Sequence, residues 1–228
     1  MGTTTYTFGS SGLLFRSNKL MYDHQTNSLW THMTGEPVVG KLAHGGIRLK
    51  VLPVVVTTWK DWRTAHPDTL VLDIKTGYRR DYTPGRPYGR YFASPDTMFP
   101  VSPRSERLRP KAEVLAVRIG TARKAFPLEV FGREPVINDR VGTTTVVVVG
   151  KPETRTARAY ERGPLTFRPG RAADELIEAG TGIPWRVEEE RLVNARTGAT
   201  LPRVGGHLVY WFGWYAFYPD SEVYGPAP

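Results

Sequence analysis

Short runs of apolar and alternating residues dominate the first quarter of the chain and predict strands. These runs occupy residues 3–8, 13–15, 19–22, 28–30 and 47–56. The polar residues 23–27 separate two of them, and an apolar run on each side of a polar turn predicts a β-hairpin. Pro53 interrupts the last run, so we expect an edge strand or a bulge at that position.

The second half of the chain shows the same kind of pattern. Strand signals occur at residues 114–119, 122–130, 143–149, 185–187 and 208–211. The four valines at 146–149 indicate a buried strand. Residues 174–178 instead predict one or two helical turns, ended near Gly180. The 23 glycines and 19 prolines favour many turns and few long helices.

One short helix is predicted after the first group of strands. Thr58 can cap it, and Trp59, Trp62 and Ala65 share one face at a spacing of three residues. Pro67 ends it, because the residue before a proline disfavours helical dihedral angles.

An internal repeat relates the two ends of the chain. Residues 59–71 and 211–223 share the pattern W-x-x-W-x-x-x-[HY]-P-D-[ST]-x-V, and residues 20–27 weakly parallel residues 191–198. The period is too long for a solenoid. We therefore predict a mainly β fold with a few short helices, built from a duplicated β-rich unit with pseudo-twofold symmetry.

The region between the units is different in composition. Residues 73–112 contain few aliphatic residues and many Arg, Tyr and Pro, which predicts a long irregular connection. We expect a first, incomplete unit at residues 1–72, this connection at 73–112, and a second unit at 113–228, all packed as one body.

Charge and cysteine content narrow the classes of function. The chain of 228 residues has a net charge of +9 and no cysteine. Without cysteine, a disulfide scaffold, an iron–sulfur cluster, a thiolate zinc site and a cysteine nucleophile are all excluded. Residues 75–124 hold twelve basic and four acidic residues, so a charge of +8 lies in this window.

Several motifs resemble one known family. They are F-G-S-S-G-L-L at residues 8–14, L-M-Y-D-H-Q-T-N-S-L-W at 20–30, A-H-P-D-T at 65–69, T-G-Y-R-R-D-Y at 76–82 and V-I-N-D at 136–139. The chain resembles the bacterial and archaeal family catalogued as domain of unknown function 3179, over most of its length. The resemblance implies no activity, because none is assigned to the family. It also implies that relatives are often longer and often exported.

The chain departs from that family pattern at two places. Longer members carry an Asn-Asp motif, a strand and a Cys-Pro-x-Cys segment before the Phe-Gly-x-Ser-Gly string, and we expect this N-terminal half-unit to be missing here. In the second unit, residues 150–153 read G-K-P-E without cysteine. A thiol or thiolate–metal role carried by the family therefore cannot operate in this chain.

The candidate ligand-binding residues are polar groups near turns and in the basic window. They are Tyr22, Asp23, His24, Tyr78, Arg79, Arg80, Asp81, Tyr82, Arg86, Tyr88, Asn138 and Asp139. Arg interleaved with Tyr can hold anionic groups while the aromatic faces stack on rings. The alternative is a structural one, in which the Arg stems lie on the Tyr rings of a crossover that covers the sheet.

Three functions remain open at this point. The first is a non-enzymatic binding module whose basic, tyrosine-rich surface takes an anionic ligand or partner, nucleic acid included. The second is an enzyme of unknown reaction, with Asp23, His24, Arg80 and Asp139 in one cleft. The third is a structural subunit of a larger assembly, which predicts an exposed apolar patch. The strand at residues 3–8 also predicts a homodimer through a free sheet edge.

Cofactors, metals and targeting signals are not indicated by the sequence. The histidines show neither H-x-H nor H-x-x-x-H spacing, and no phosphate loop, dinucleotide fingerprint or serine elbow occurs. We predict no metal and no cofactor. Neither a transmembrane segment nor a signal peptide is predicted, and the compartment is left open.

Overall fold

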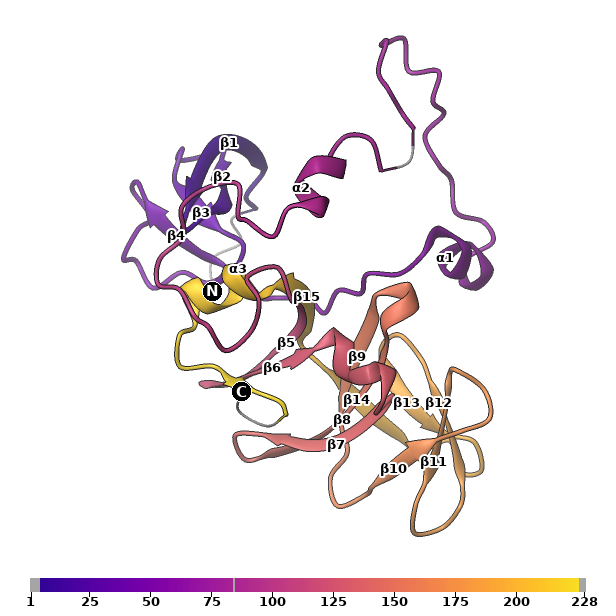
Figure 1. Ribbon diagram of the computed structural model, residues 1–228. Helices are drawn as coiled ribbons and strands as arrows, with labels where there is room; N and C mark the ends of the chain where they lie inside the picture. The colour runs from indigo at the N-terminus through magenta and orange to yellow at the C-terminus, as the bar shows by residue number, and fades with distance from the viewer. Residues whose placement is uncertain (1–4, 84, 226–228) are drawn as a thin grey trace.

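Three β-sheets and three short α-helices form the structure that we describe for residues 5–83 and 85–225 in a computed structural model (Figure 1). The mainly β class predicted from the pattern is thereby confirmed. In the described part of the chain, each helix falls short of the length and hydrophobicity that crossing a membrane requires.

The first sheet holds the predicted hairpin. Its four antiparallel strands run in the order β1 (Phe8–Phe15), β2 (Asn18–Asp23), β3 (Leu29–Thr31) and β4 (Glu36–Val39). The runs at residues 13–15, 19–22 and 28–30 are confirmed as strands. The strand predicted at residues 3–8 lies partly outside the described residues, and β1 begins at the last of them.

The second sheet has eight strands and curls until its two edges meet. Its order is β10 (Phe167–Pro169), β11 (Glu175–Glu178), β12 (Pro184–Val187), β13 (Arg191–Asn194), β14 (Thr200–Val204), β9 (Thr156–Glu161), β8 (Thr144–Lys151) and β7 (Val136–Val141). The Asn138 side chain donates to the carbonyl of Phe167 at 2.7 Å and accepts from its N–H at 2.8 Å. These two bonds join edge β7 to edge β10, so the sheet is nearly a closed barrel.

The helical turns predicted at residues 174–178 are wrong, because β11 occupies this position. Its burial alternates, with Leu176 and Glu178 buried and the residues between them half-exposed. That period of two is typical of a strand with one face on a core. Trp185 on β12 reinforces it by donating from its indole N–H to Glu178 at 3.0 Å.

The third sheet packs against the helix near the C-terminus. Its order is β15 (Gly206–Tyr210), β5 (Glu113–Ile119), β6 (Ala122–Pro127) and β16 (Glu222–Val223), and β16 runs parallel to β6. The strand predicted at 122–130 ends at Pro127, where the 3-10 helix η1 (Leu128–Gly132) begins; a second one, η2 (Pro152–Thr154), follows β8. The main core lies between this sheet and the barrel-like sheet, around Val117, Phe126 and Val146.

Two of the three helices share the same local structure. The predicted helix is confirmed as α1 (Trp59–Ala65), capped by Thr58, and α3 (Trp211–Phe217) is its counterpart in the repeat. The two C-cap residues have φ/ψ of −133°/72° and −133°/70°.

The contacts of the two tryptophans match as well. Trp62 donates to Thr69 at 3.0 Å, and Trp214 donates to Ser221 at 2.8 Å, seven residues ahead in both cases. These matches support the predicted duplication, which remains a prediction.

Matching turns point to the same relationship between the hairpins. The turn after Asp23 places Asn27 at φ +56°, and the turns after Glu178 and Asn194 place glycines at φ +71° and +73°. Asn and Gly are the residues that tolerate this left-handed conformation most readily. The carboxylates of Asp23 and Glu178 each accept a hydrogen bond from the indole N–H of the tryptophan seven residues ahead. The similarity between residues 20–27 and residues 191–198 thus extends to a third segment, residues 175–182.

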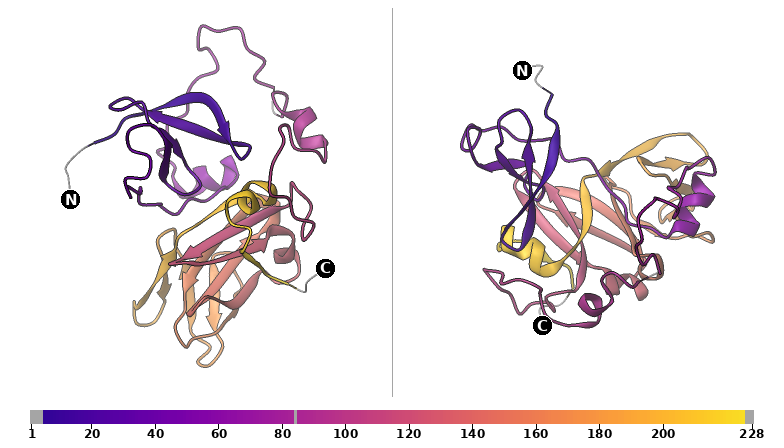
Figure 2. Two further views of the ribbon diagram at one scale, coloured as in Figure 1. Left: turned by 90° about the vertical axis from the view of Figure 1, so that its left-hand side faces the viewer. Right: turned by 90° about the horizontal axis from the view of Figure 1, so that it is seen from above.

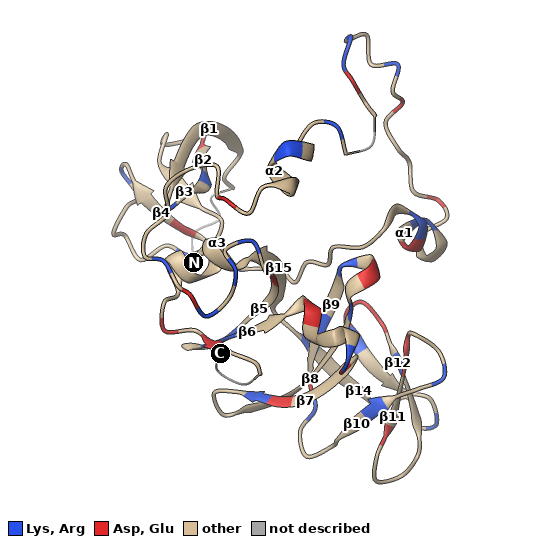
Figure 3. Ribbon diagram, viewed as in Figure 1, with Lys and Arg blue, Asp and Glu red and all other residues tan. Residues whose placement is uncertain are grey.

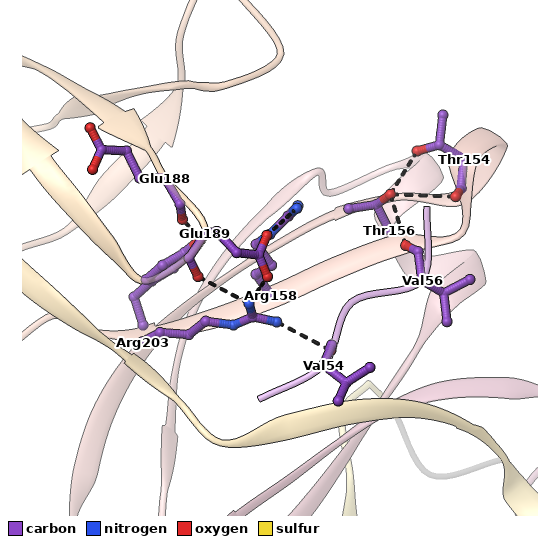
Figure 4. Close-up of polar contacts among 9 residues, drawn as sticks. Val54, Val56, Thr154, Thr156, Arg158, Glu188, Glu189 and Arg203 are labelled. Atoms are coloured by element: carbon purple, nitrogen blue, oxygen red, sulfur yellow. Dashed lines mark hydrogen bonds and ion pairs between the residues drawn. The ribbon is translucent and has the colours of Figure 1, made fainter. Parts of the chain in front are cut away.

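Residues 47–56 form no strand, so that prediction is wrong. The segment instead crosses the body between the first and second sheets and is held by side chains (Figure 4). The buried guanidinium of Arg203 donates to the carbonyl of Val54 at 3.2 Å and also pairs with Glu189. Thr156 donates to the carbonyl of Val56 at 3.1 Å. The alternating pattern of residues 47–56 therefore belongs to a segment that forms no ladder of hydrogen bonds with a neighbouring strand.

A polar junction joins the first sheet to α3. Tyr218 donates its hydroxyl to the carbonyl of Met33 at 2.9 Å and accepts from Arg118 at 2.7 Å. His207 on β15 lies edge-on to Trp214, with 6.2 Å between ring centroids. Burial, followed by the charges of His32 and Arg118, lowers the pKa of His207 below its ordinary value of 6.5.

The lowered pKa of His207 predicts a loss of stability in mildly acidic solution. The unfolded chain takes up this proton near pH 6.5, while the folded chain resists it. The stabilisation is therefore complete above pH 6.5 and is lost as the pH falls towards the folded-state pKa. Urea denaturation at several pH values between 8 and 5 is expected to show this decline.

The control for this prediction is His207→Gln, which keeps the ring site polar but cannot titrate. Its free energy of unfolding is expected to vary less over the same pH range. The pKa values of Asp23 and Glu189 lie below 3.8 and 4.5, respectively. Protonation of these carboxylates therefore changes the free energy of unfolding only at more acidic pH. An unchanged pH slope in His207→Gln would contradict the prediction.

Candidate anion-binding surface

A long arm projects from the body between α1 and the third sheet. We define it as residues 67–94, which include α2 (Gly89–Ala93); position 84 is outside the described residues. The arm loops away from the sheets in Figures 1 and 2. From residue 70 to 94, the described residues are exposed, apart from the half-buried Thr76, Tyr91 and Ser94.

Three of the four tyrosines of the arm, all except Tyr91, do not serve as packing anchors. Tyr78 is 74% exposed, and Tyr82 and Tyr88 are also open to solvent. Tyr82 makes a hydrogen bond of 2.9 Å to Thr76 inside the arm, and Tyr88 lies edge-on to Phe92. The arrangement in which this part of the chain covers the sheet is therefore not the one observed.

The basic window is partly neutralised by acidic partners. Four of its twelve cations pair with carboxylates: Arg86 with Asp81, Arg109 with Glu129, Arg123 with Asp220, and Lys124 with Asp139 and Glu222. Within the described residues, the other eight have no carboxylate within 4.0 Å: Lys75, Arg79, Arg80, Arg90, Arg104, Arg107, Lys111 and Arg118. Four of these eight lie on the arm, along which Figure 3 shows Lys and Arg in blue.

The root of the arm, residues 95–112, packs against α3. Lys111 of the root holds the C-terminal end of the arm. Its ammonium donates to the carbonyls of Tyr91 and Ser94 and lies 3.7 Å from the Tyr91 ring centroid. Arg107 lies over the rings of Trp211 and Tyr215 at 5.2 and 5.5 Å.

A pocket of about 420 Å³ opens between the root and α3. Its lining residues include the aromatic Trp211, Phe212 and Tyr215, the basic Arg104 and Arg109, and the acidic Asp96 and Glu106. Aromatic residues beside charged groups of both signs suit a flat ligand that carries polar groups.

Sequence reasoning missed this pocket. Its basic residues lie in the charged window, and its aromatic residues lie in the second copy of the repeat. Both signals were visible in the sequence. Their contact was not, because they are about a hundred residues apart along the chain.

Asp23 was expected at a ligand site, and the structure places it in a hydrogen-bonded turn. It is fully buried, and its carboxylate accepts from Trp30 Nε1 at 2.8 Å and from the hydroxyl and N–H of Thr26. Burial alone would raise the pKa of Asp23, but these hydrogen bonds outweigh it and lower the pKa. The rings of its neighbours Tyr22 and His24 contact each other in a tilted arrangement, with 4.9 Å between ring centroids.

Asn138 and Asp139 lie on β7, in the barrel-like sheet. Asn138 joins the barrel edges, and Asp139 pairs with Lys124 at 2.7 Å. Among the described residues, no hydrogen bond or ion pair links Asp23, His24, Arg80 and Asp139 to one another. A shared cleft formed by these four remains a prediction.

Asp81 and Arg86 pair within the arm at 3.3 Å. Arg79 and Arg80, close by in the sequence, pair with no carboxylate of the described residues. Hydrogen bonds from the side chain and N–H of Thr83 lower the pKa of Asp81. The described residues contain no cluster of three or more His, Asp or Glu that could hold a metal ion.

Comparison with known proteins gives one match. The family model described as "Protein of unknown function (DUF3179)" matches residues 1–221. No curated protein and no solved structure matches the chain.

Proposed function

The chain belongs to the DUF3179 family of proteins of unknown function, which assigns no activity, and from its geometry we propose a binding module for an anionic ligand that carries flat rings. The arm, residues 67–94, is the binding surface. The observation that carries the proposal is the exposure of Tyr78, Tyr82 and Tyr88 near guanidinium groups that pair with no carboxylate among the described residues.

Physical chemistry favours this use of the arm. Exposed tyrosine faces offer stacking platforms for bases or sugar rings, and free arginines pair with phosphate or carboxylate oxygens. Arg79 and Arg80 stand between Tyr78 and Tyr82, so both kinds of group alternate along one segment. The pocket at the root supplies a more enclosed site for a ring of the same ligand.

Removing the free charges of the arm is expected to weaken binding strongly. In the triple variant Arg79→Gln, Arg80→Gln and Arg90→Gln, affinity for a single-stranded oligothymidylate is expected to fall about tenfold or more at low salt. The slope of log affinity against log salt is expected to become shallower by about 2, because up to three phosphate contacts are lost. Fluorescence titration at several salt concentrations measures both.

A charge-matched control separates the arm from general basicity. Arg48, Arg155 and Arg186 are exposed and each already pairs with a glutamate, so their triple Gln variant loses the same net charge from the body. This control is expected to retain most of the affinity. Equal losses in both triple variants, or full retention in the arm variant, would refute the proposal.

A further inference from the structure

The helix α1 exposes an apolar face that its counterpart α3 buries. Trp59 and Trp62 are 50% and 39% exposed, whereas Trp211 and Trp214 are each 1% exposed. Around α3, the covering residues come from β5, β6 and the loop that holds Met33. The C-cap conformation and the indole hydrogen bond are the same in both helices, whereas α1 carries Lys60, Asp61 and Arg63 where α3 carries Phe212, Gly213 and Tyr215.

The residues that follow the two helices show the same contrast in exposure. After α3, β16 pairs with β6, and Tyr224 stacks on Phe126 at 5.5 Å. After α1, the equivalent residues are open: Leu70, Val71, Leu72 and Ile74 are 95%, 73%, 85% and 69% exposed. Within the described residues, residues 70–74 make no backbone hydrogen bond to another strand.

We propose that residues 58–74, here called the docking segment, bind the same residues of a second copy of this chain. The contact is isologous, so each copy contributes the tryptophan face of α1 and the extended residues 70–74. The two extended segments pair antiparallel across the twofold axis, and the tryptophans cover them. This surface differs from the sheet edge that the sequence predicted at residues 3–8.

Charge favours a second copy as the occupant. The docking segment holds Lys60 and Arg63 against Asp61, Asp68 and Asp73, a net charge of −1 in a chain of +9. Two copies therefore meet outside the basic window of residues 75–124, where their positive charges do not repel each other.

The available apolar area is also sufficient. Six large side chains of the segment are exposed, each by on the order of 100 Å², so a pair buries roughly 1,200 Å². That is the lower limit for a specific protein–protein interface. An extended apolar segment with unpaired backbone groups also favours pairing with another chain.

Pairing through this segment brings two arms onto one particle, because the basic part of each arm begins at the next residue, Lys75. Such a dimer presents two basic surfaces to one long ligand. The pairing itself does not depend on whether the arm binds anions.

The oligomeric state of the full chain tests the proposal. Light scattering coupled to size-exclusion chromatography, over about a hundredfold range of protein concentration, is expected to show twice the mass of the chain. In Trp59→Ser with Trp62→Ser, the dimer dissociation constant is expected to rise about tenfold or more. The control Tyr78→Ser with Tyr88→Ser removes equally exposed aromatic rings from the arm and is expected to remain dimeric.

A second variant covers the case in which the tryptophan variant fails to fold, as judged by circular dichroism. Val71→Asp sets like charges near each other across the twofold axis and is expected to dissociate the dimer. A monomer at every concentration overturns the proposal. So does a dimer that survives both variants, because its contact would lie elsewhere, for example at the edge of β1.

Discussion

Trp214→Ala is expected to destabilise the protein by about 4 kcal/mol, which is the usual cost of removing a buried tryptophan. Trp214 is 1% exposed, packs at a tilt against Tyr218 with 4.3 Å between ring centroids, and donates to Ser221 at 2.8 Å. The substitution leaves a cavity against β5 and β6 and a buried hydroxyl without its donor. Urea denaturation of dilute protein measures the loss.

The repeat supplies a matched control for this prediction. Trp62→Ala removes the same side chain and the equivalent hydrogen bond to Thr69, but from an exposed position. It is expected to cost about 1 kcal/mol or less in dilute protein, because its surface is already largely in water. Equal costs at both positions would show that the contrast in burial between α1 and α3 is wrong.

Asp23→Ala is expected to destabilise the protein by about 3 kcal/mol. The carboxylate satisfies the buried indole N–H of Trp30 and the N–H and hydroxyl of Thr26, and alanine can accept from none of them. Trp30 is itself 2% exposed, so water cannot replace the lost acceptor. Chemical denaturation at neutral pH measures the effect.

The pH dependence of Asp23 has a definite sign. Because its folded-state pKa lies below 3.8, its stabilisation is present above that pH and is lost as the pH falls through the folded-state value. Asp23→Ala is expected to be less sensitive to pH in this acidic range. Asp81→Ala is the control, since Asp81 makes a similar turn on the exposed arm and is expected to change stability by less than about 0.5 kcal/mol.

An effect of Asp23→Ala on ligand binding without loss of stability would contradict this account. It would favour the cleft predicted around Asp23, His24, Arg80 and Asp139. The burial of Asp23 and the contacts of Asp139 with Lys124 favour structural roles for both carboxylates.

Sequence patterns correctly predicted the elements that are stabilised by residues close to them in the sequence. The hairpin at residues 18–31 and the capped helix α1 follow from turn residues, a threonine cap and a proline, which act on near neighbours. Residues 47–56 and 174–178 were predicted wrongly because distant residues decide them. The first segment is held by Arg203 and Thr156 instead of a strand, and the second pairs with β12.

The candidate surface was predictable in part. The density of Arg and Tyr marked residues 75–124, and the exposure of the arm agrees with a binding role. The pairing of three of its cations with carboxylates, and the pocket against Trp211, depend on residues from other parts of the chain.

The two copies of W-x-x-W show where the sequence stops being sufficient. By itself, the sequence predicted the helix α1 and, through the repeat, marked residues 211–217 as its equivalent; the shared C-cap and indole hydrogen bond depend on neighbours within about ten residues. Only the tertiary structure decided that the tryptophans of α3 are covered and those of α1 exposed. Burial depends on which strands lie opposite, and in the described chain β5 and β6 lie opposite only one of the two helices.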